Sequence, residues 1–112
     1  MGQHVLEKGD TKPPLKVQAQ DFEGDPIDVK GAMLYFNMFD RNGDIVVDQG
    51  SVNIVNDGTD GKIEHRWETG ETDEVGVYKA EFVAEYSDGV LTIPNDGFID
   101  VRINTINEDE TR

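Results

Sequence analysis

The sequence contains no cysteine, so no disulfide can hold this chain together and the packing of apolar side chains must stabilise it. It also has no apolar run close to the roughly 18 residues that would cross a bilayer. Its first residues, 1–5, show neither the basic nor the apolar segment of a secretion signal. A chain of 112 residues can bury a modest core. We therefore expect one domain without a membrane segment or an export signal of its own.

Basic residues are scarce as well. The chain has 10 Lys and Arg against 24 Asp and Glu, which gives a net charge of −14. Nucleic acids and anionic membranes are bound mainly through Lys and Arg, so neither is an expected partner. A net charge of this size is common in disordered proteins, but the regular alternation of apolar residues argues against disorder here. Adaptation to high salt stays open, because salt at about 1 M screens repulsion within about 3 Å.

The distribution of apolar residues is typical of an all-β protein. Apolar and polar residues alternate, and Gly, Asn or Asp interrupts the chain about every 8–12 residues. No segment has the spacing of a long helix. The pattern predicts strands at residues 15–19, 32–39, 45–47, 51–55, 62–67, 77–86, 90–93 and 98–103.

The residue pattern of three of these strands predicts which of their faces are buried. Residues 32–39 are apolar on both parities except at Asn37, which predicts a central strand covered on much of both faces. In 77–86, the longest strand, one parity is apolar and should face the core, whereas the other carries Lys79, Glu81 and Glu85. The apolar set is Tyr78, Ala80, Phe82 and Ala84. Residues 98–103 alternate in the same way, with Ile99, Val101 and Ile103 on one parity.

The connections between the strands read as turns. Asn42-Gly43 readily supplies the positive φ angles of a tight hairpin between 32–39 and 45–47. Residues 56–61 contain two Gly and no apolar side chain, so they should join 51–55 to 62–67. Residues 87–89 form a short hairpin loop, and Pro94 cannot donate a ladder hydrogen bond at the end of the next strand.

A tyrosine corner is predicted before the longest strand. Asp73, Gly76 and Tyr78 have the D-x-x-G-x-Y spacing of the corner in which a Tyr hydroxyl binds the backbone of the preceding turn. Two residues later, where antibody domains have their second cysteine, the chain has Ala80. We therefore expect an immunoglobulin-like antiparallel β-sandwich of about 7–9 strands. It would span residues 1–103, with an acidic tail at 104–112.

Several motifs occur in an order that resembles one family. They are KGD at 8–10, PPL at 13–15, GA at 31–32, DRNG at 40–43, GKI at 61–63, the corner at 73–78, YKAEFVAEYSDG at 78–89 and PNDGFI at 94–99. In this order and spacing the chain resembles, over about residues 5–103, the N-terminal domain family of phage baseplate upper proteins. These domains are immunoglobulin-like modules of tailed-virus particles.

The resemblance implies a structural, non-enzymatic component of a tailed-virus particle, in the baseplate or tail, at the neck, or decorating the capsid. Its partners would be other virion proteins and copies of itself, as an oligomer in a particle assembled in the host cytoplasm. It implies no cofactor. With the acidic composition, it would indicate the virus of a salt-loving host such as a haloarchaeon.

The resemblance also bears on how the module would make its contacts. In multidomain relatives the module begins a longer protein with receptor-binding parts. Here the chain ends with it, so receptor binding is not expected. Sheet edges and the two arms, residues 1–8 and 104–112, are the expected contacts between subunits.

One candidate metal site in the sequence is a calcium site at residues 40–44. Residues 40–44 alternate three oxygen-bearing side chains, as the start of an EF-hand loop does. That loop needs Gly at its sixth position and Glu at its twelfth, where this chain has Ile45 and Ser51, so we expect a plain hairpin turn. A weak surface cation site at other turns is a minor alternative that would use Asp57, Asp60 and Asp96.

No catalytic or metal-binding residue is predicted. His4 and His65 are the only imidazoles and no Cys accompanies them, which disfavours a zinc site. His65 lies between charged neighbours in a predicted strand, so we expect it to be half-exposed. Ser51 and Ser87 are not in a nucleophile elbow, and no phosphate-binding glycine motif is present.

The aromatic residues leave one alternative function open. Trp67, the sole Trp, is predicted to be a core or rim residue at a strand end in preference to a platform for sugar stacking. Five other aromatic residues are predicted to be core: Tyr35, Phe36, Phe39, Phe82 and Tyr86. The alternative function is a carbohydrate-binding or adhesion module, for which Trp67 and Tyr86 are the candidate residues. An enzyme ranks third.

Overall fold

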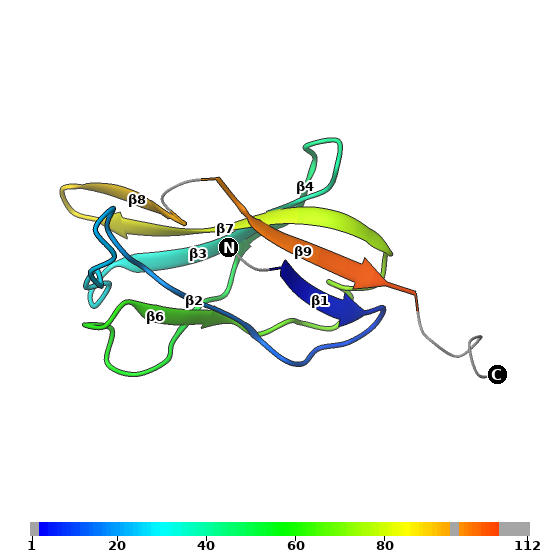
Figure 1. Ribbon diagram of the computed structural model, residues 1–112, viewed down its shortest axis with the longest axis horizontal. Coiled ribbons are helices and arrows are strands. Elements are labelled where there is room, and N and C mark those ends of the chain that lie inside the picture. Colours follow the sequence, from blue (N-terminus) through cyan, green and yellow to red (C-terminus); the bar gives the residue numbers. More distant parts are fainter. Residues whose placement is uncertain (1–2, 95–96, 106–112) are drawn as a thin grey trace.

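The computed structural model describes residues 3–94 and 97–105, and these residues form nine β-strands and no helix. The strands are β1 (Gln3–Glu7), β2 (Leu15–Gln18), β3 (Met33–Phe39), β4 (Ile45–Gly50), β5 (Asn53–Ile54), β6 (Lys62–His65), β7 (Gly76–Tyr86), β8 (Gly89–Ile93) and β9 (Ile99–Asn104). Figure 1 shows two layers, with β3, β7 and β9 in one and β2 and β6 in the other. The predicted all-β sandwich is confirmed.

The two sheets differ in size. The larger sheet has the order β1-β9-β7-β3-β4, with β8 also paired to β7. The smaller sheet has the order β2-β6-β5. Immunoglobulin-type sandwiches likewise place their second, fourth and fifth strands in one sheet against the third, sixth and seventh. The observed order agrees with that arrangement when β4 is taken as an extra strand beside β3, as in variable-type domains, β8 and β9 as one interrupted last strand, and β1 as the first strand, placed at the edge of the larger sheet.

β7 is the central strand of the larger sheet. One of its edges pairs with β3, and the other pairs with β9 in its first half and with β8 in its second half. Its alternating faces follow the prediction, because Tyr78, Ala80, Phe82 and Ala84 are all buried. Three neighbouring strands therefore take their register from β7.

β1 corrects two expectations. We expected an antiparallel sandwich with a free N-terminal arm at residues 1–8, but β1 pairs with β9 in parallel and makes the sheet mixed. Leu6 points into the core, and Lys8 extends the pairing by donating from its backbone to the Asn104 carbonyl. Asn104, the first residue of the predicted tail, belongs to β9, and residues 106–112 of that prediction lie outside the described part of the chain.

The hairpin between β3 and β4 forms as predicted, with a different turn geometry. The Asp40 N–H donates to the Asp44 carbonyl, and the Asp40 carboxylate accepts the N–H groups of Asn42 and Asp44, each at 2.9 Å. Gly43 has a φ of 88°, whereas Asn42 does not have a positive φ. A single left-handed glycine therefore closes the hairpin, and the Asn-Gly pair does not supply two positive angles.

A β-bulge interrupts β4 after the hairpin. The register with β3 shifts between the Met38–Val47 and Phe36–Gly50 pairs, which leaves one extra residue on β4. Gln49 absorbs the shift with a φ of 55°, and the Asn37 side-chain oxygen accepts its N–H at 2.8 Å. The prediction of a central β3 holds, because β7 and β4 flank it.

The smaller sheet has the predicted alternation in shorter strands. In β2, Leu15 is buried and Val17 is half-buried, and Ala19 beyond the strand is fully buried. β5 comprises only Asn53–Ile54, although the Val55 N–H still binds the Lys62 carbonyl beyond it. The turn at 56–61 joins β5 to β6, as expected.

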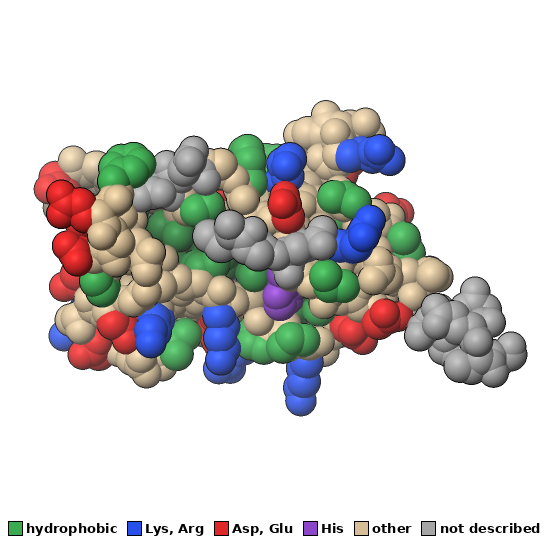
Figure 2. Space-filling view, viewed as in Figure 1, with side chains coloured by type: hydrophobic (Ala, Val, Ile, Leu, Met, Phe, Trp, Pro, Cys, Tyr) green, Lys and Arg blue, Asp and Glu red, His purple; other side chains and the backbone are tan. Residues whose placement is uncertain are grey.

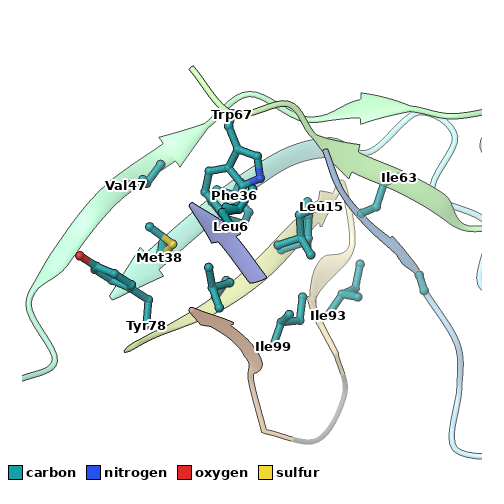
Figure 3. Close-up of a cluster of buried hydrophobic side chains, with 14 of the residues drawn as sticks. Leu6, Leu15, Phe36, Met38, Val47, Ile63, Trp67, Tyr78, Ile93 and Ile99 are labelled. Carbon is teal, nitrogen blue, oxygen red and sulfur yellow. The ribbon is translucent and has the colours of Figure 1, made fainter. Parts of the chain in front are cut away.

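The core lies between the sheets. Figure 3 shows side chains from both sheets meeting there, with Trp67 over Phe36. Trp67 is buried, as are Phe36 and Phe82, which confirms these three predicted core residues. The other three predicted core aromatics, Tyr35, Phe39 and Tyr86, are only half-buried. For Tyr35 and Phe39 the reason is parity, because they share the face of β3 opposite to Phe36.

The tyrosine corner is present. The Tyr78 hydroxyl donates to the Glu74 carbonyl at 2.7 Å and holds the turn before β7 against the strand. Burial raises the pKa of Tyr78, and the charges of Glu74 and Asp40 raise it further. The hydroxyl therefore stays protonated and remains a donor.

We expect Tyr78→Phe to lower the free energy of unfolding by about 1 kcal/mol, because it removes the corner hydrogen bond and keeps the buried ring. Urea unfolding followed by fluorescence measures the change. Tyr35→Phe is the matched control, because its hydroxyl has no hydrogen-bond partner among the described residues. Equal effects of the two substitutions would contradict a stabilising role for the corner.

Candidate functional site

His65 is the most unusual polar residue of the structure. We expected a half-exposed sheet residue, but its side chain is 0% exposed. It shares the inward parity of β6 with Ile63, and Trp67 beyond the strand has the same parity. The prediction was wrong because it weighed the charged neighbours and not the parity, which was the available signal.

Both ring nitrogens of His65 have partners. Nδ1 lies 2.7 Å from the Ser51 carbonyl oxygen, and Nε2 lies 2.8 Å from Oε1 of Glu71. A carbonyl oxygen can only accept, so Nδ1 carries a proton. The second contact also needs a proton, held either by Nε2 facing an ionised Glu71 or by the carboxyl group facing a neutral ring. His65 and Glu71 thus share one proton inside the fold.

Aromatic rings enclose His65. Its ring stacks on Phe36 with centroids 4.0 Å apart and planes at 7°, and the Trp67 indole meets it edge-on at 5.1 Å. Gly50 leaves space for the His65 ring because it has no side chain. A Cβ at this position would lie 2.9 Å from Val47 and 3.2 Å from the His65 ring. The bulge that brings Gly50 to this place is therefore part of the same arrangement.

Glu71 fastens the segment after β6 to this ring. Burial acts to raise the pKa of the Glu71 carboxyl, but hydrogen bonds from His65 and from the Glu68 N–H, with the charge of His65, lower it below its ordinary value. A His–carboxylate pair is also two-thirds of a catalytic triad. Here Ser51 contacts the ring through its carbonyl oxygen, and both nitrogens are occupied in a buried position. The geometry is that of a structural link between β6, Ser51 and the segment at 68–71.

His4 lies on the other side of Trp67. Its ring is half-buried with its centroid 6.0 Å from that of the indole, and the Trp67 Nε1–H donates to His4 Nε2 at 3.4 Å. Burial lowers the pKa of His4, and a hydrogen bond to the Pro13 backbone opposes this in part. A neutral ring suits the contact, because only an unprotonated Nε2 can accept the indole N–H.

The acidic turns are closed by their own hydrogen bonds. The Asp57 carboxylate accepts from the backbone and the hydroxyl of Thr59, and that of Asp60 accepts from Asn56 and from the Lys62 N–H. These bonds lower the pKa of both carboxyl groups. Asp96, the third residue of the weak cation hypothesis, lies outside the described residues. In the part of the chain that is described, no group of three or more His, Cys, Asp or Glu could hold a metal ion.

The candidate carbohydrate residues are partly engaged inside the fold. Trp67 is 4% exposed, so its ring faces cannot stack on a sugar, and the predicted core role is confirmed. Tyr86 is half-buried, and its hydroxyl donates to the Asp28 carbonyl at 2.8 Å.

The outer face of the larger sheet collects exposed apolar residues. Eleven large hydrophobic residues are exposed within the described chain, and six of them belong to this face. They are 44–68% exposed and comprise Val5, Met33, Ile45, Val77, Val90 and Phe98. Figure 2 shows part of this face as green side chains along the upper margin, over β8. We call these six residues the apolar face.

Strand pairing places these residues on one face with charged residues between them. Arg102 lies between Val5 and Val77, and Glu85 lies between Val90 and Met33. Phe98 joins through its ring, which meets the half-buried Phe39 edge-on at 6.1 Å. The outward charges on β7 and β9 are two cations and three carboxylates, a net charge of −1, namely Lys79, Arg102, Glu81, Glu85 and Asp100. The outer sides of these two strands are therefore nearly neutral in a chain of net charge −14.

Comparison with known proteins gives no family. No protein-family model matches the sequence, and no curated protein matches it. The described residues contain no helix long and apolar enough to cross a membrane. The surfaces of the sandwich are therefore the features that bear on its function.

Glu71→Gln tests the buried pair. We expect it to lower the free energy of unfolding at pH 7 by about 1–3 kcal/mol, because it weakens a charge-assisted hydrogen bond inside the fold. The lowered pKa of Glu71 means that this contribution is complete above about 4.5, its ordinary value, and is lost as pH falls toward the folded-state pKa. The wild type should therefore lose more stability than the variant between pH 7 and pH 3.

Glu68→Gln is the matched control for that substitution, because Glu68 contacts Glu71 through its backbone N–H. Urea unfolding at several pH values measures both variants. Parallel stability curves of Glu71→Gln and the wild type would contradict the role of the Glu71 charge.

The environment of His4 predicts a pKa below 6.5, its ordinary value, in the folded protein. Its folded-state pKa is lowered, so the associated stability is present above pH 6.5 and is lost as pH falls through the folded-state pKa. An NMR titration of the imidazole carbon-bound protons measures it directly, with the urea-unfolded chain as reference. A folded-state pKa at or above the reference value would show that burial does not control this ring.

Proposed function

We propose that this chain is a structural component of a tailed-virus particle that acts through protein–protein contacts and carries out no chemistry. The order of motifs that resembles the baseplate family supports this proposal, and so does the agreement of the fold with the sandwich that the resemblance implied. The tyrosine corner formed by Tyr78 and Glu74 is one feature on which sequence and structure agree.

The apolar face is the observation that carries the proposal. Exposed apolar residues scattered singly need no explanation, but a contiguous group on one face is typical of a protein–protein interface. Aromatic and apolar residues at the centre with few net charges are also typical of such interfaces. Phe98 and Ile45, joined through Phe39, form the contiguous part of the apolar face, and Lys79 and Asp100 form an ion pair of 3.5 Å on the same face.

The apolar face would be buried at each position in the particle that the proposal covers. A baseplate or tail protein, a neck protein and a capsid-decorating protein would each bury it against another virion protein or another copy. The acidic remainder of the surface would keep the assembled particle soluble, since like charges repel at their exposed sides. In the virus of a salt-loving host, high salt would screen that repulsion.

The test is the protein composition and structure of purified particles from the source of this chain. We expect mass spectrometry to detect the chain in stoichiometric amount, and cryo-electron microscopy to place it at a symmetric position with Val77 and Phe98 against a neighbour. Absence from mature particles would overturn the structural function. A symmetric position with the apolar face in solvent would retain the function and overturn the interface.

A variant pair tests the face itself. Val77→Asp places a charge on the apolar face, and we expect it to reduce incorporation into particles at least about tenfold, because a buried unpaired charge opposes association. Val75→Asp is the matched control, an exposed valine in the turn before β7. Equal incorporation of the two variants, at unchanged melting temperature, would contradict the proposed contact.

A further inference from the structure

The outer face of the smaller sheet is basic, which is unexpected in this chain. Four of the ten Lys and Arg residues lie on it or beside it, namely Lys12, Lys16, Lys62 and Arg66. Figure 2 shows blue side chains along the lower margin, over β2, β6 and the segment before β2. We call these four residues the basic face.

The register of the sheet explains how the basic face forms. Lys16 pairs with Glu64, and Lys62 pairs with Gln18, so both lysines point away from the buried Ile63. Lys16 and Lys62 line one shallow hollow with Val17, Gln18, Val55 and Asn56. Arg66 and Lys12 line a second hollow with Thr11, Pro13 and Pro14.

The charge of the basic face contrasts with that of the rest of the chain. Glu64 is the carboxylate within it, and its side chain is 8% exposed beneath the Arg66 guanidinium, 2.6 Å away. Four cations and one carboxylate give the face a net charge of +3, which falls to +1 when Asp57 and Asp60 at its end are counted, in a chain at −14. Asp57 and Asp60 lie in the turn at one end of the face.

The complementary surface lies on the same chain. The loop at 21–28 contains four acidic residues, and the 87–88 hairpin adds Asp88 beside it. The Tyr86 hydroxyl ties the two together by donating to the Asp28 carbonyl. The loop is ordered, because the Asp21 carboxylate accepts the N–H groups of Glu23 and Asp25, each at 2.9 Å. We call residues 21–28 with Asp88 the acidic end, which is part of the red group at the left of Figure 2.

We propose that the basic face binds the acidic end of a second copy of this chain. Charge complementarity selects this occupant: the two surfaces have opposite charge, and both are exposed apart from the covered Glu64. They are different patches, so the contact is head-to-tail, and repetition closes a ring or extends a filament. The inference names the partner for the building-block function proposed above and rests on it for its biological setting, but self-association is measurable without a particle.

Sedimentation velocity of the full chain tests the contact at about 0.15 M salt, where the Debye length is about 8 Å and whole-molecule repulsion is damped. We expect association that grows with concentration between about 1 μM and 1 mM. It should weaken at about 1 M salt, where screening reaches the contact itself. A wild-type chain that stays monomeric throughout at about 0.15 M salt would overturn the proposal.

Charge reversals assign the surfaces. The double variant Lys16→Glu with Lys62→Glu should weaken association at least about tenfold, and so should Glu23→Lys with Asp25→Lys on the acidic end. A mixture of the two double variants should associate again, because each supplies the surface that the other has lost. Lys8→Glu with Arg41→Glu is the control, with the same change in net charge at exposed positions outside both surfaces. The control variant should lose less association than the basic-face variant, and an equal loss would overturn the proposal.

The outcomes separate this inference from the proposed function. A chain that is monomeric in solution and contacts only other proteins in the particle overturns the self-contact and retains the structural function. A chain that associates through these surfaces but is absent from particles supports the contact and overturns the function. An unchanged melting temperature of each double variant shows that lost association is not lost folding.

Discussion

The face-to-face stack of Phe36 on His65 determines how the two sheets meet. Phe36 belongs to the larger sheet and His65 to the smaller, and the chain has no cysteine that could join the two sheets through a disulfide. The rest of the arrangement accommodates this stack. The β4 bulge brings Gly50 against the ring, Trp67 closes its edge, and Glu71 completes its hydrogen bonding. A polar ring thereby becomes part of an apolar core with both nitrogens satisfied.

The sequence predicts features that depend on local pattern and misses those that depend on distant partners. Alternation alone identified the inner face of β7, and the spacing of Gly76 and Tyr78 identified the corner. β1 escaped prediction because it is short, mixed in polarity and paired in parallel with a strand at the opposite end of the chain. Glu71 escaped because it follows β6 in an irregular segment, where no periodicity indicates which side chain turns inward.

The surface groups also depend on residues that are distant in sequence, so local pattern does not predict them. The contact of Phe98 with Phe39 and the proximity of Lys16 to Arg66 require the folded sheets, because each pair is distant in sequence. Composition gave the net charge of −14 but not its uneven distribution over the sandwich. One outer face carries six exposed apolar residues, and the other carries four cations. A module with two chemically distinct faces can bind two different neighbours at once, which suits a repeating assembly.

The bulge at Gln49 restricts how such an assembly can grow. An edge strand normally offers a straight row of backbone donors and acceptors to which another strand can add. In β4 the left-handed Gln49 interrupts that row just before the strand ends at Gly50. A neighbour cannot extend the ladder along the whole of β4, so lateral polymerisation into an endless sheet is blocked on this side. Any growth on this side would have to use side-chain contacts on the faces, which can close a ring or extend a filament.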